Sequence, residues 1–236
     1  MSIFTNQTIS VSPDTISGLI GWWKADALSL NNGDAIDSWT DSSTSANHGT
    51  QTLTARPTYV TNVINNLPVV RFDGTDDSLV ITDVTTMRHY FVVMKWAGTN
   101  NLASVMGRTT TPIRFYGGTT ATELVIHQTF SYSQVVNGTA YNNGTLLANT
   151  AALYRDYTKF QIYESTTTAT GISWDRIGGI TSGANNYYIN ADVAEIVIFS
   201  AILTEANRLL VQNYLSRKYN IPTGTGYTPM TNVAKT

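Results

Sequence analysis

The stretch Tyr188–Ile221, YINADVAEIVIFSAILTEANRLLVQNYLSRKYNI, predicts a β-strand followed directly by an α-helix. In its first half Ala194, Ile196 and Ile198 alternate with further apolar residues and with Glu195. A strand with apolar groups at both alternating sets of positions is typical of one buried on both faces. We therefore expect this strand to have apolar groups on both faces. Elsewhere in the chain, the continuous apolar run His89–Trp96 (HYFVVMKW) predicts a central strand.

The second half of the stretch has the signals of a helix with defined ends. Thr204 is a favourable N-cap, and Arg217 and Lys218 in the last turn complement the helix dipole. Asn220 and Pro222 then end the helix. The apolar residues at helical spacing indicate the face that we expect to be buried, namely Ala206, Leu209, Leu210 and Tyr214.

This strand-and-helix ending resembles the closing segment of laminin-G-like (LamG) domains, a branch of the concanavalin A-like lectin/glucanase superfamily. Further segments resemble the same family: Gly18–Asp26 (GLIGWWKAD), Trp39–His48 (WTDSSTSANH), Leu67–Leu79 (LPVVRFDGTDDSL), Val136–Thr139 (VNGT) and Arg176–Gly179 (RIGG). The resemblance implies an all-β fold, a jelly-roll-like antiparallel β-sandwich of the concanavalin A-like type with one C-terminal helix. It implies little about function, because this sandwich carries lectins, hydrolases, adhesion modules and virion proteins.

The chain of 236 residues is long enough for one large sandwich with a buried core. We expect residues 12–221 to form that sandwich, residues 1–11 an N-terminal arm and residues 222–236 a C-terminal tail. The side chains that we expect to be buried are Leu19, Trp23, Phe72, Val92, Val93, Ile196 and Ile198.

The composition bears on surface and location. Charged residues make up 13% of the chain, about half of the usual ~25%, so Thr, Ser and Asn must supply much of the polar surface. Such a surface is common on extracellular and virion proteins. A net charge of −2 without a basic cluster argues against nucleic-acid binding. The absence of cysteine excludes disulfides and thiol chemistry.

Targeting signals are also missing from the sequence. The first ten residues, MSIFTNQTIS, lack the basic and apolar regions of a secretory signal peptide. No apolar run approaches the ~20 residues of a membrane span, so we expect no membrane insertion. These features predict a protein made in a host cytoplasm and located on a virion surface, with an extracellular location as the alternative.

The sequence offers no constellation for catalysis. Glucanases of the superfamily that the chain resembles carry Glu-x-Asp-x-Glu on one strand, which places the carboxylates on one face. Here Asp192 and Glu195 are three residues apart and should point to opposite faces. The histidines His48, His89 and His127 are isolated, and no G-x-S-x-G segment occurs. We predict that the protein is not an enzyme, and a diverged glycoside hydrolase is the last alternative.

Acidic residues in turn-rich segments are the candidates for a metal site. Asp73, Asp76 and Asp77 could supply hard oxygen ligands for calcium, as could Asp37 and Asp41. The segment DGTDD is also favourable turn chemistry, with Gly74 in the strained position. We favour the turn and predict no cofactor, with calcium as the alternative.

Sugar recognition needs aromatic rings beside amides and carboxylates on loops. The candidates for a ligand-binding surface are Trp96, Trp174, Asp175, Asn185, Asn186, Tyr187 and Tyr188. Packing inside the sandwich is the alternative for each aromatic residue.

Together these features predict a non-catalytic structural or binding protein on a virion surface, as a phage head decoration or fibre component. Its partners would be other virion proteins or further copies of itself, held through the terminal arms. Weak binding of a cell-surface glycan would accompany this role. The alternative is a stand-alone extracellular lectin or adhesin module.

Overall fold

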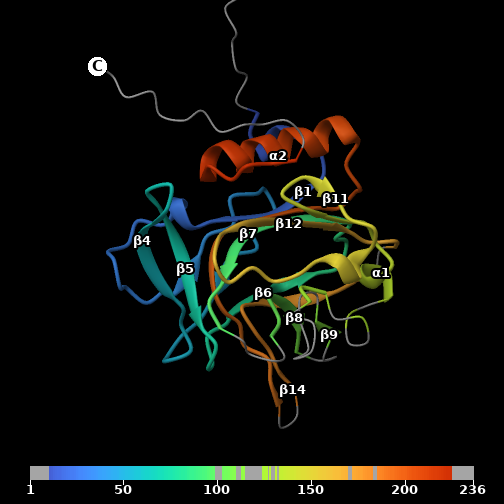
Figure 1. The fold of residues 1–236 in the computed structure, drawn as a ribbon. Coiled ribbons are helices and arrows are strands. Elements are labelled where there is room, and N and C mark those ends of the chain that lie inside the picture. Colours follow the sequence, from blue (N-terminus) through green and yellow to red (C-terminus); the bar gives the residue numbers. More distant parts are fainter. Residues whose placement is uncertain are drawn as a thin grey trace, which may run out of the picture.

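The computed structural model of the chain describes residues 11–98, 103–109, 113–114, 124–126, 128, 131, 133–169, 172–182 and 185–224. These residues form two facing antiparallel β-sheets, with α2 (Glu205–Tyr219) lying across the outer face of the larger sheet (Figure 1). The fold is thus mostly β and is consistent with the predicted all-β sandwich. The jelly-roll arrangement of its strands stays a prediction.

The larger sheet brings together strands from both ends of the chain. Its order is β11 (Thr145–Leu146), β10 (Ala140–Asn142), β12 (Gln161–Thr166), β7 (His89–Trp96), β16 (Asn190–Phe199), β5 (Leu67–Asp73) and β4 (Thr58–Ile64). The N-terminal strand β1 (Leu19–Lys24) also pairs with β16. The central place predicted for His89–Trp96 is confirmed, because β7 lies between β12 and β16.

The smaller sheet faces the first across the core. Its order is β2 (Ser38–Trp39), β3 (Gly49–Thr50), β6 (Leu79–Val84), β13 (Trp174–Ile177), β8 (Met106–Arg108) and β9 (Ile113–Arg114). A separate hairpin of β14 (Thr181–Ser182) and β15 (Asn185–Asn186) follows β13. The remaining described helices are short: α1 (Ser133–Val136) and the 3-10 turns Pro13–Thr15, Ala25–Ala27 and Thr150–Ala152.

Strand β16 lies between two apolar cores, which explains its apolar residues on both faces. Ile196 and Ile198 belong to the core between the two sheets, whereas Val197 and Phe199 belong to a second core beneath α2. All four side chains are fully buried. Burying each of them contributes about 1.5–3 kcal/mol. The double-sided burial predicted for this strand is therefore confirmed.

The predicted core residues are buried with one exception. Trp23, Phe72, Val92, Val93, Ile196 and Ile198 are fully buried. The prediction for Leu19 was wrong, because this side chain is only partly buried. Leu19 starts β1, where the register with β16 is irregular, and it lines a surface cavity beside Ser42 and Ser43.

The predicted ends of the C-terminal helix are confirmed. The Thr204 hydroxyl oxygen accepts a hydrogen bond from the Asn207 backbone N–H at 3.3 Å, as an N-cap does. Asn220 ends the helix in the left-handed conformation, with φ of 54°. The helix begins and ends through local contacts that the sequence pattern contains.

The predicted buried face of this helix was wrong. Ala206 is exposed, and Leu210 and Tyr214 are only partly buried. The buried residues are instead Arg208, Val211, Gln212, Leu215, Ser216 and Tyr219. The buried face carries Val211, Leu215 and Tyr219 at a spacing of four, which is a second apolar pattern in the same segment. Arg208 lies on this face and pairs with Glu164 of β12.

Candidate functional site

The tryptophans expected to form a sugar-binding surface lie inside the sandwich. Trp96 and Trp174 are fully buried in the core between the sheets, and Tyr187 is 6% exposed. Trp174 packs edge-on against Trp23, with ring centroids 5.7 Å apart. The expected surface position of these aromatic residues was therefore wrong. Trp96 lies on the same face of β7 as Val92 and Met94, which belong to this core.

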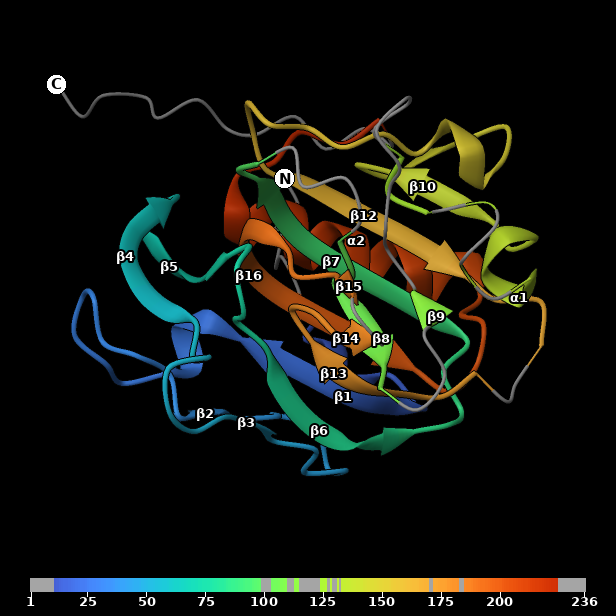
Figure 2. The same cartoon turned by 90° about the horizontal axis from the view of Figure 1, so that it is seen from below.

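The other candidate residues lie in and beside the β14–β15 hairpin. Asn186 is exposed and Tyr188 is partly exposed, and Asn185 is placed in β15. The Tyr188 hydroxyl lies 2.6 Å from the Thr181 hydroxyl, which also donates to the Asn186 side-chain oxygen at 3.2 Å. This hairpin projects beyond the smaller sheet (Figure 1), and Figure 2 views the molecule from that end.

Asp175 is held by its own neighbours on the smaller sheet. Its Oδ1 atom accepts hydrogen bonds from the Thr109 backbone N–H and the Thr109 hydroxyl, both at 3.1 Å. The same atom lies 3.6 Å from Arg176 Nη1. These contacts leave Asp175 as a structural anchor of β13 rather than an open ligand group.

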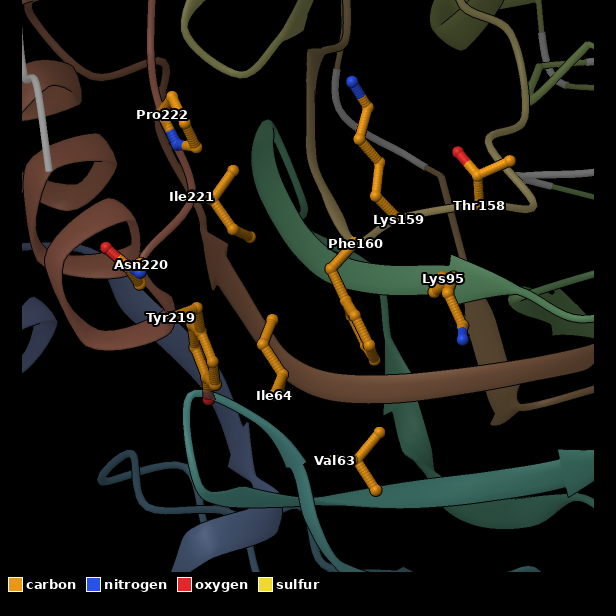
Figure 3. Close-up of a pocket in the computed structure, with 10 residues that line it drawn as sticks. All are labelled: Val63, Ile64, Lys95, Thr158, Lys159, Phe160, Tyr219, Asn220, Ile221 and Pro222. Carbon is orange, nitrogen blue, oxygen red and sulfur yellow. The ribbon is translucent and has the colours of Figure 1, made fainter. Parts of the chain in front are cut away.

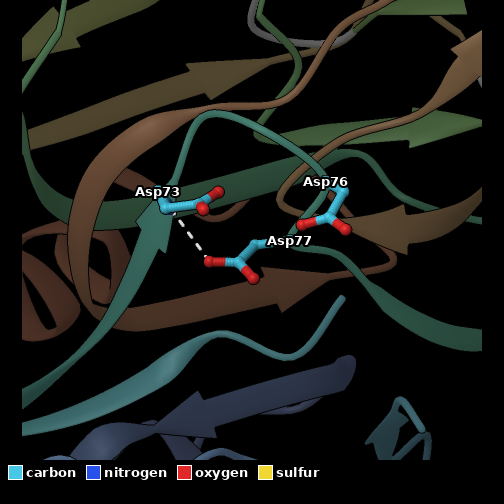
Figure 4. Close-up of side chains that lie close together, drawn as sticks. All are labelled: Asp73, Asp76 and Asp77. Atoms are coloured by element: carbon cyan, nitrogen blue, oxygen red, sulfur yellow. Dashed lines mark hydrogen bonds between the residues drawn. The ribbon is translucent and has the colours of Figure 1, made fainter. Parts of the chain in front are cut away.

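Three aspartates gather where β5 ends and the loop to β6 begins (Figure 4). The carboxylates of Asp73, Asp76 and Asp77 lie within 4.8 Å of one another. The Asp73 backbone N–H donates to Asp77 Oδ2 at 2.9 Å, and the Thr75 backbone N–H donates to Asp73 Oδ1 at 2.7 Å. Gly74 has φ of 81°, the conformation that the turn requires.

The electrostatics of this turn centre on Asp77, which is 5% exposed. The pKa of Asp77 is raised to about 6, chiefly by burial and also by the charges of Asp73 and Asp76, while the hydrogen bond from the Asp73 backbone N–H acts to lower it. The three carboxylates are the residues that could hold a hard cation. The hydrogen bonds of Asp73 and Asp77 are also those of a turn, which is the interpretation that the sequence favours over a metal site.

The acidic turn and the hairpin share one end of the sandwich. Asp73 is the register partner of Asn190, which lies two residues after Tyr188. On the other sheet, Leu79 follows Asp77 by two residues and pairs with Ile177. This end therefore combines carboxylates, an amide and a tyrosine hydroxyl, the polar groups that can bind a sugar.

The other acidic candidates are occupied elsewhere. Asp41 accepts hydrogen bonds from the backbone N–H groups of Trp22, Ser43 and Asn47 at 2.7–2.9 Å. Asp37 forms an ion pair with Arg56 at 2.5 Å. Within the described residues, Asp73, Asp76 and Asp77 are the one acidic group close enough to share a cation.

Sequence reasoning missed a buried ionic chain between the larger sheet and α2. His89 Nε2 lies 2.9 Å from Glu164 Oε1, and Arg208 Nη1 lies 3.1 Å from Glu164 Oε2. His89 Nδ1 accepts the Leu203 backbone N–H at 3.2 Å, which places the ring proton on Nε2. Arg208 also binds both carboxylate oxygens of Glu205, at 2.7 and 2.8 Å.

A second buried carboxylate joins β16 to the end of α2. Glu195 accepts hydrogen bonds from the Trp22 indole at 2.5 Å, the Tyr219 hydroxyl at 2.7 Å and the Lys218 ammonium at 2.7 Å. Burial and this carboxylate together raise the pKa of Tyr219 well above its usual value. The only signal for this buried contact in the sequence was a single glutamate, Glu195, inside an apolar strand.

Surface cavities occur on the side of the molecule that carries α2. One of about 300 Å³ is lined by Asp14 and the hydroxyl groups of Ser42, Ser43 and Thr44, with Ile16, Gly18 and Leu19. A groove of about 350 Å³ lies between the C-terminal end of α2 and the start of β12. It is lined by Val63, Ile64, Lys95, Thr158, Lys159, Phe160, Tyr219, Asn220, Ile221 and Pro222.

Among the described helices, none has both the length and the apolar character needed to cross a membrane. His127 and the terminal residues 1–10 and 225–236 lie outside the described residues. Comparisons of the chain with protein-family models, curated proteins and solved structures find no match, so its resemblance to laminin-G-like domains stays a prediction.

Proposed function

We propose that the protein is a non-catalytic display module of a virion surface, attached through its terminal segments and presenting the β14–β15 end of its sandwich outward. The observation that carries this proposal is the placement of the two described ends of the chain. Pro13–Thr15 packs beside α2, and Gly224 donates its backbone N–H to the Asn143 carbonyl at the edge of the larger sheet. The hairpin projects from the opposite side (Figure 1).

This arrangement suits a protein that binds neighbouring proteins on its α2 side and is exposed on the side of the β14–β15 hairpin. Arms leaving on the α2 side would hold other virion proteins or further copies of the chain. The hairpin would offer Asn186 and Tyr188, with the acidic turn beside them, to a cell-surface glycan. Many copies on one particle would make a weak sugar contact effective through multivalency.

The location of the strand glutamates supports a role without catalysis. Glu164 and Glu195 are fully buried beneath α2. Each is paired with a cation of that helix, at 3.1 Å to Arg208 and 2.7 Å to Lys218. A retaining glycosidase needs two accessible carboxyl groups about 5–5.5 Å apart. Incubation with β-glucans, polysialic acid, chitin and capsule polysaccharide should therefore release no reducing ends.

The orientation can be tested on particles that contain the chain. Antibodies raised against the β14–β15 hairpin should label the particle surface in negative-stain electron microscopy. Antibodies against residues 1–10 and 225–236 should label only dissociated particles. Equal labelling of the ends on intact particles would contradict attachment through the arms. Tight binding of a defined sugar by a chain found only free in solution would favour the stand-alone lectin or adhesin.

A further inference from the structure

The groove at the C-terminal end of α2 has two walls from distant parts of the chain (Figure 3). One wall is Tyr219–Pro222, where the chain leaves α2, and the other is Lys159 and Phe160 before β12. Ile64 lies between them and adds an apolar floor. The groove is on the α2 side of the molecule, away from the β14–β15 hairpin (Figure 1).

The wall before β12 is held in place by one carboxylate. Asp156 Oδ1 accepts the backbone N–H groups of Thr158 and Lys159 at 2.8 and 3.1 Å. Asp156 Oδ2 accepts the Gln161 side-chain amide at 2.7 Å. The backbone at Lys159 is thus held in place before any ligand arrives, which lowers the entropy cost of ordering this wall on binding.

The opposite wall is held by hydrogen bonds at the end of the helix. The Ile221 backbone N–H donates to the Ser216 carbonyl at 3.0 Å, and the Ser216 hydroxyl donates to the Ile221 carbonyl at 2.5 Å. The Asn65 side-chain amide donates to the Lys218 carbonyl at 2.8 Å, which ties the turn after β4 to the same helix end. Both walls are therefore preformed.

The charged residues that line the groove are both lysines, Lys95 and Lys159, whereas the chain as a whole has a net charge of −2. Neither Lys95 nor Lys159 forms an ion pair with any residue that the structure describes. Asp192 is the register partner of Lys95, but its two oxygens bind Arg71 at 2.6 and 2.9 Å. No carboxylate is among the residues that line the groove.

The two ammonium groups do not converge on one point. Lys95 Nζ lies 5.7 Å from the centroid of the Phe160 ring. In Figure 3 Lys159 points away from Lys95, so the two ammonium groups lie apart, with Phe160 between their backbone positions. A single small anion could contact only one of them. An extended ligand with repeated negative charges, and an apolar face between them, could contact both.

We propose that this groove binds an acidic oligosaccharide whose successive pyranose rings carry carboxylates. The C–H face of one ring would pack on Phe160 and Ile64, and the carboxylates on either side would bind Lys95 and Lys159. The volume of about 350 Å³ is within the range of small-ligand sites. This site is separate from the hairpin and does not depend on the display role.

The test is calorimetric titration of the full chain with trigalacturonate. Its methyl ester is the matched control ligand, because it has the same rings without the charges. We expect binding of trigalacturonate that weakens at high salt, and no binding of the ester. Lys95→Gln and Lys159→Gln should each weaken binding by about two- to fivefold. Lys24→Gln removes one positive charge from β1, outside the groove, and should leave the affinity unchanged.

Phe160→Leu keeps an apolar side chain against the second core and removes the ring face, so it should weaken trigalacturonate binding while the fold is retained. Circular dichroism of each variant checks the fold. Equal binding of the ester, equal loss in Lys24→Gln, or equal affinity for monomeric galacturonate would each overturn the proposal. Absence of trigalacturonate binding by the folded chain at low salt would overturn it as well.

Discussion

Arg208 of α2 and Glu164 of β12 form an ion pair inside the protein, with Nη1 and Oε2 3.1 Å apart and both side chains almost fully buried. The pair lies on the face of the helix that also buries Val211, Leu215 and Tyr219 against the sheet. Glu164 also contacts His89, and Arg208 lies over the Tyr141 ring at 4.2 Å. The helix is therefore held by directional contacts as well as by its apolar residues.

Arg208→Met should destabilise the fold by about 3–5 kcal/mol, because it leaves the Glu164 carboxylate buried without its cation. Urea denaturation followed by circular dichroism measures this loss. Arg217→Met changes an exposed residue in the last turn of the same helix and should cost at most about 1 kcal/mol, the size of a surface charge effect at the helix dipole. Adding Glu164→Gln to Arg208→Met should recover part of the loss. Equal stability of the two single variants would contradict a structural role for the pair.

Asp77 should make stability depend on pH. Its pKa is raised from 3.8 to about 6 by burial first and by Asp73 and Asp76 next. The folded chain therefore holds this proton more tightly than the unfolded chain does. The contribution of Asp77 is present in full below about pH 4 and is lost as the pH rises through about 6, with a size of about 2–3 kcal/mol.

Asp77→Asn retains an acceptor for the Asp73 backbone N–H and removes the charge. It should be more stable than the parent chain at about pH 7.5 and should flatten the change between about pH 4 and pH 7. Asp14→Asn removes an exposed carboxylate elsewhere and should leave that change intact. An unaltered pH profile in Asp77→Asn, measured by urea denaturation, would show that Asp77 is not its source.

A comparison of alanine substitutions at Gly178 and Gly33 distinguishes the cost of backbone strain from the cost of a steric clash. These glycines have φ of +93° and +92°, but a Cβ on Gly178 would lie 2.1 Å from Phe72 Cε1, whereas one on Gly33 would meet nothing within 4 Å. Gly33→Ala should cost about 1–2 kcal/mol for the left-handed conformation. Gly178→Ala should cost a further 1–3 kcal/mol or so for the overpacked core. Equal melting temperatures of the two variants would contradict the close packing of Gly178 on Phe72.

Calcium should have little effect on the acidic turn. The hydrogen bonds of Asp73 and Asp77 already account for the shape of the loop, at 2.7 Å from Thr75 and 2.9 Å between the two aspartates. We expect millimolar calcium and an excess of chelator to give the same melting temperature. A rise in melting temperature with calcium that Asp76→Asn abolishes would instead establish a metal site at Asp73, Asp76 and Asp77.

The sequence alone determined those parts of the structure that depend on short-range pattern. Thr204 and Asn220 mark the ends of α2 because capping involves residues within one turn. Two strands, β7 and β16, have apolar residues at both alternating sets of positions. Such a pattern is typical of a strand that is buried on both faces. The pair Asn143-Gly144 is also typical of a turn, because both residue types tolerate positive φ, which is 48° and 76° in the structure.

Only the tertiary structure decided how these elements face one another. The helix buries Arg208 instead of Ala206 because the carboxylate that pairs with Arg208 comes from β12, 44 positions away in the chain. Trp174 is buried because Trp23 from β1 packs against it. The groove that places Lys95 and Lys159 around Phe160 unites residues from separate segments. Side-chain partners distant in sequence set these features, and no local pattern contains them.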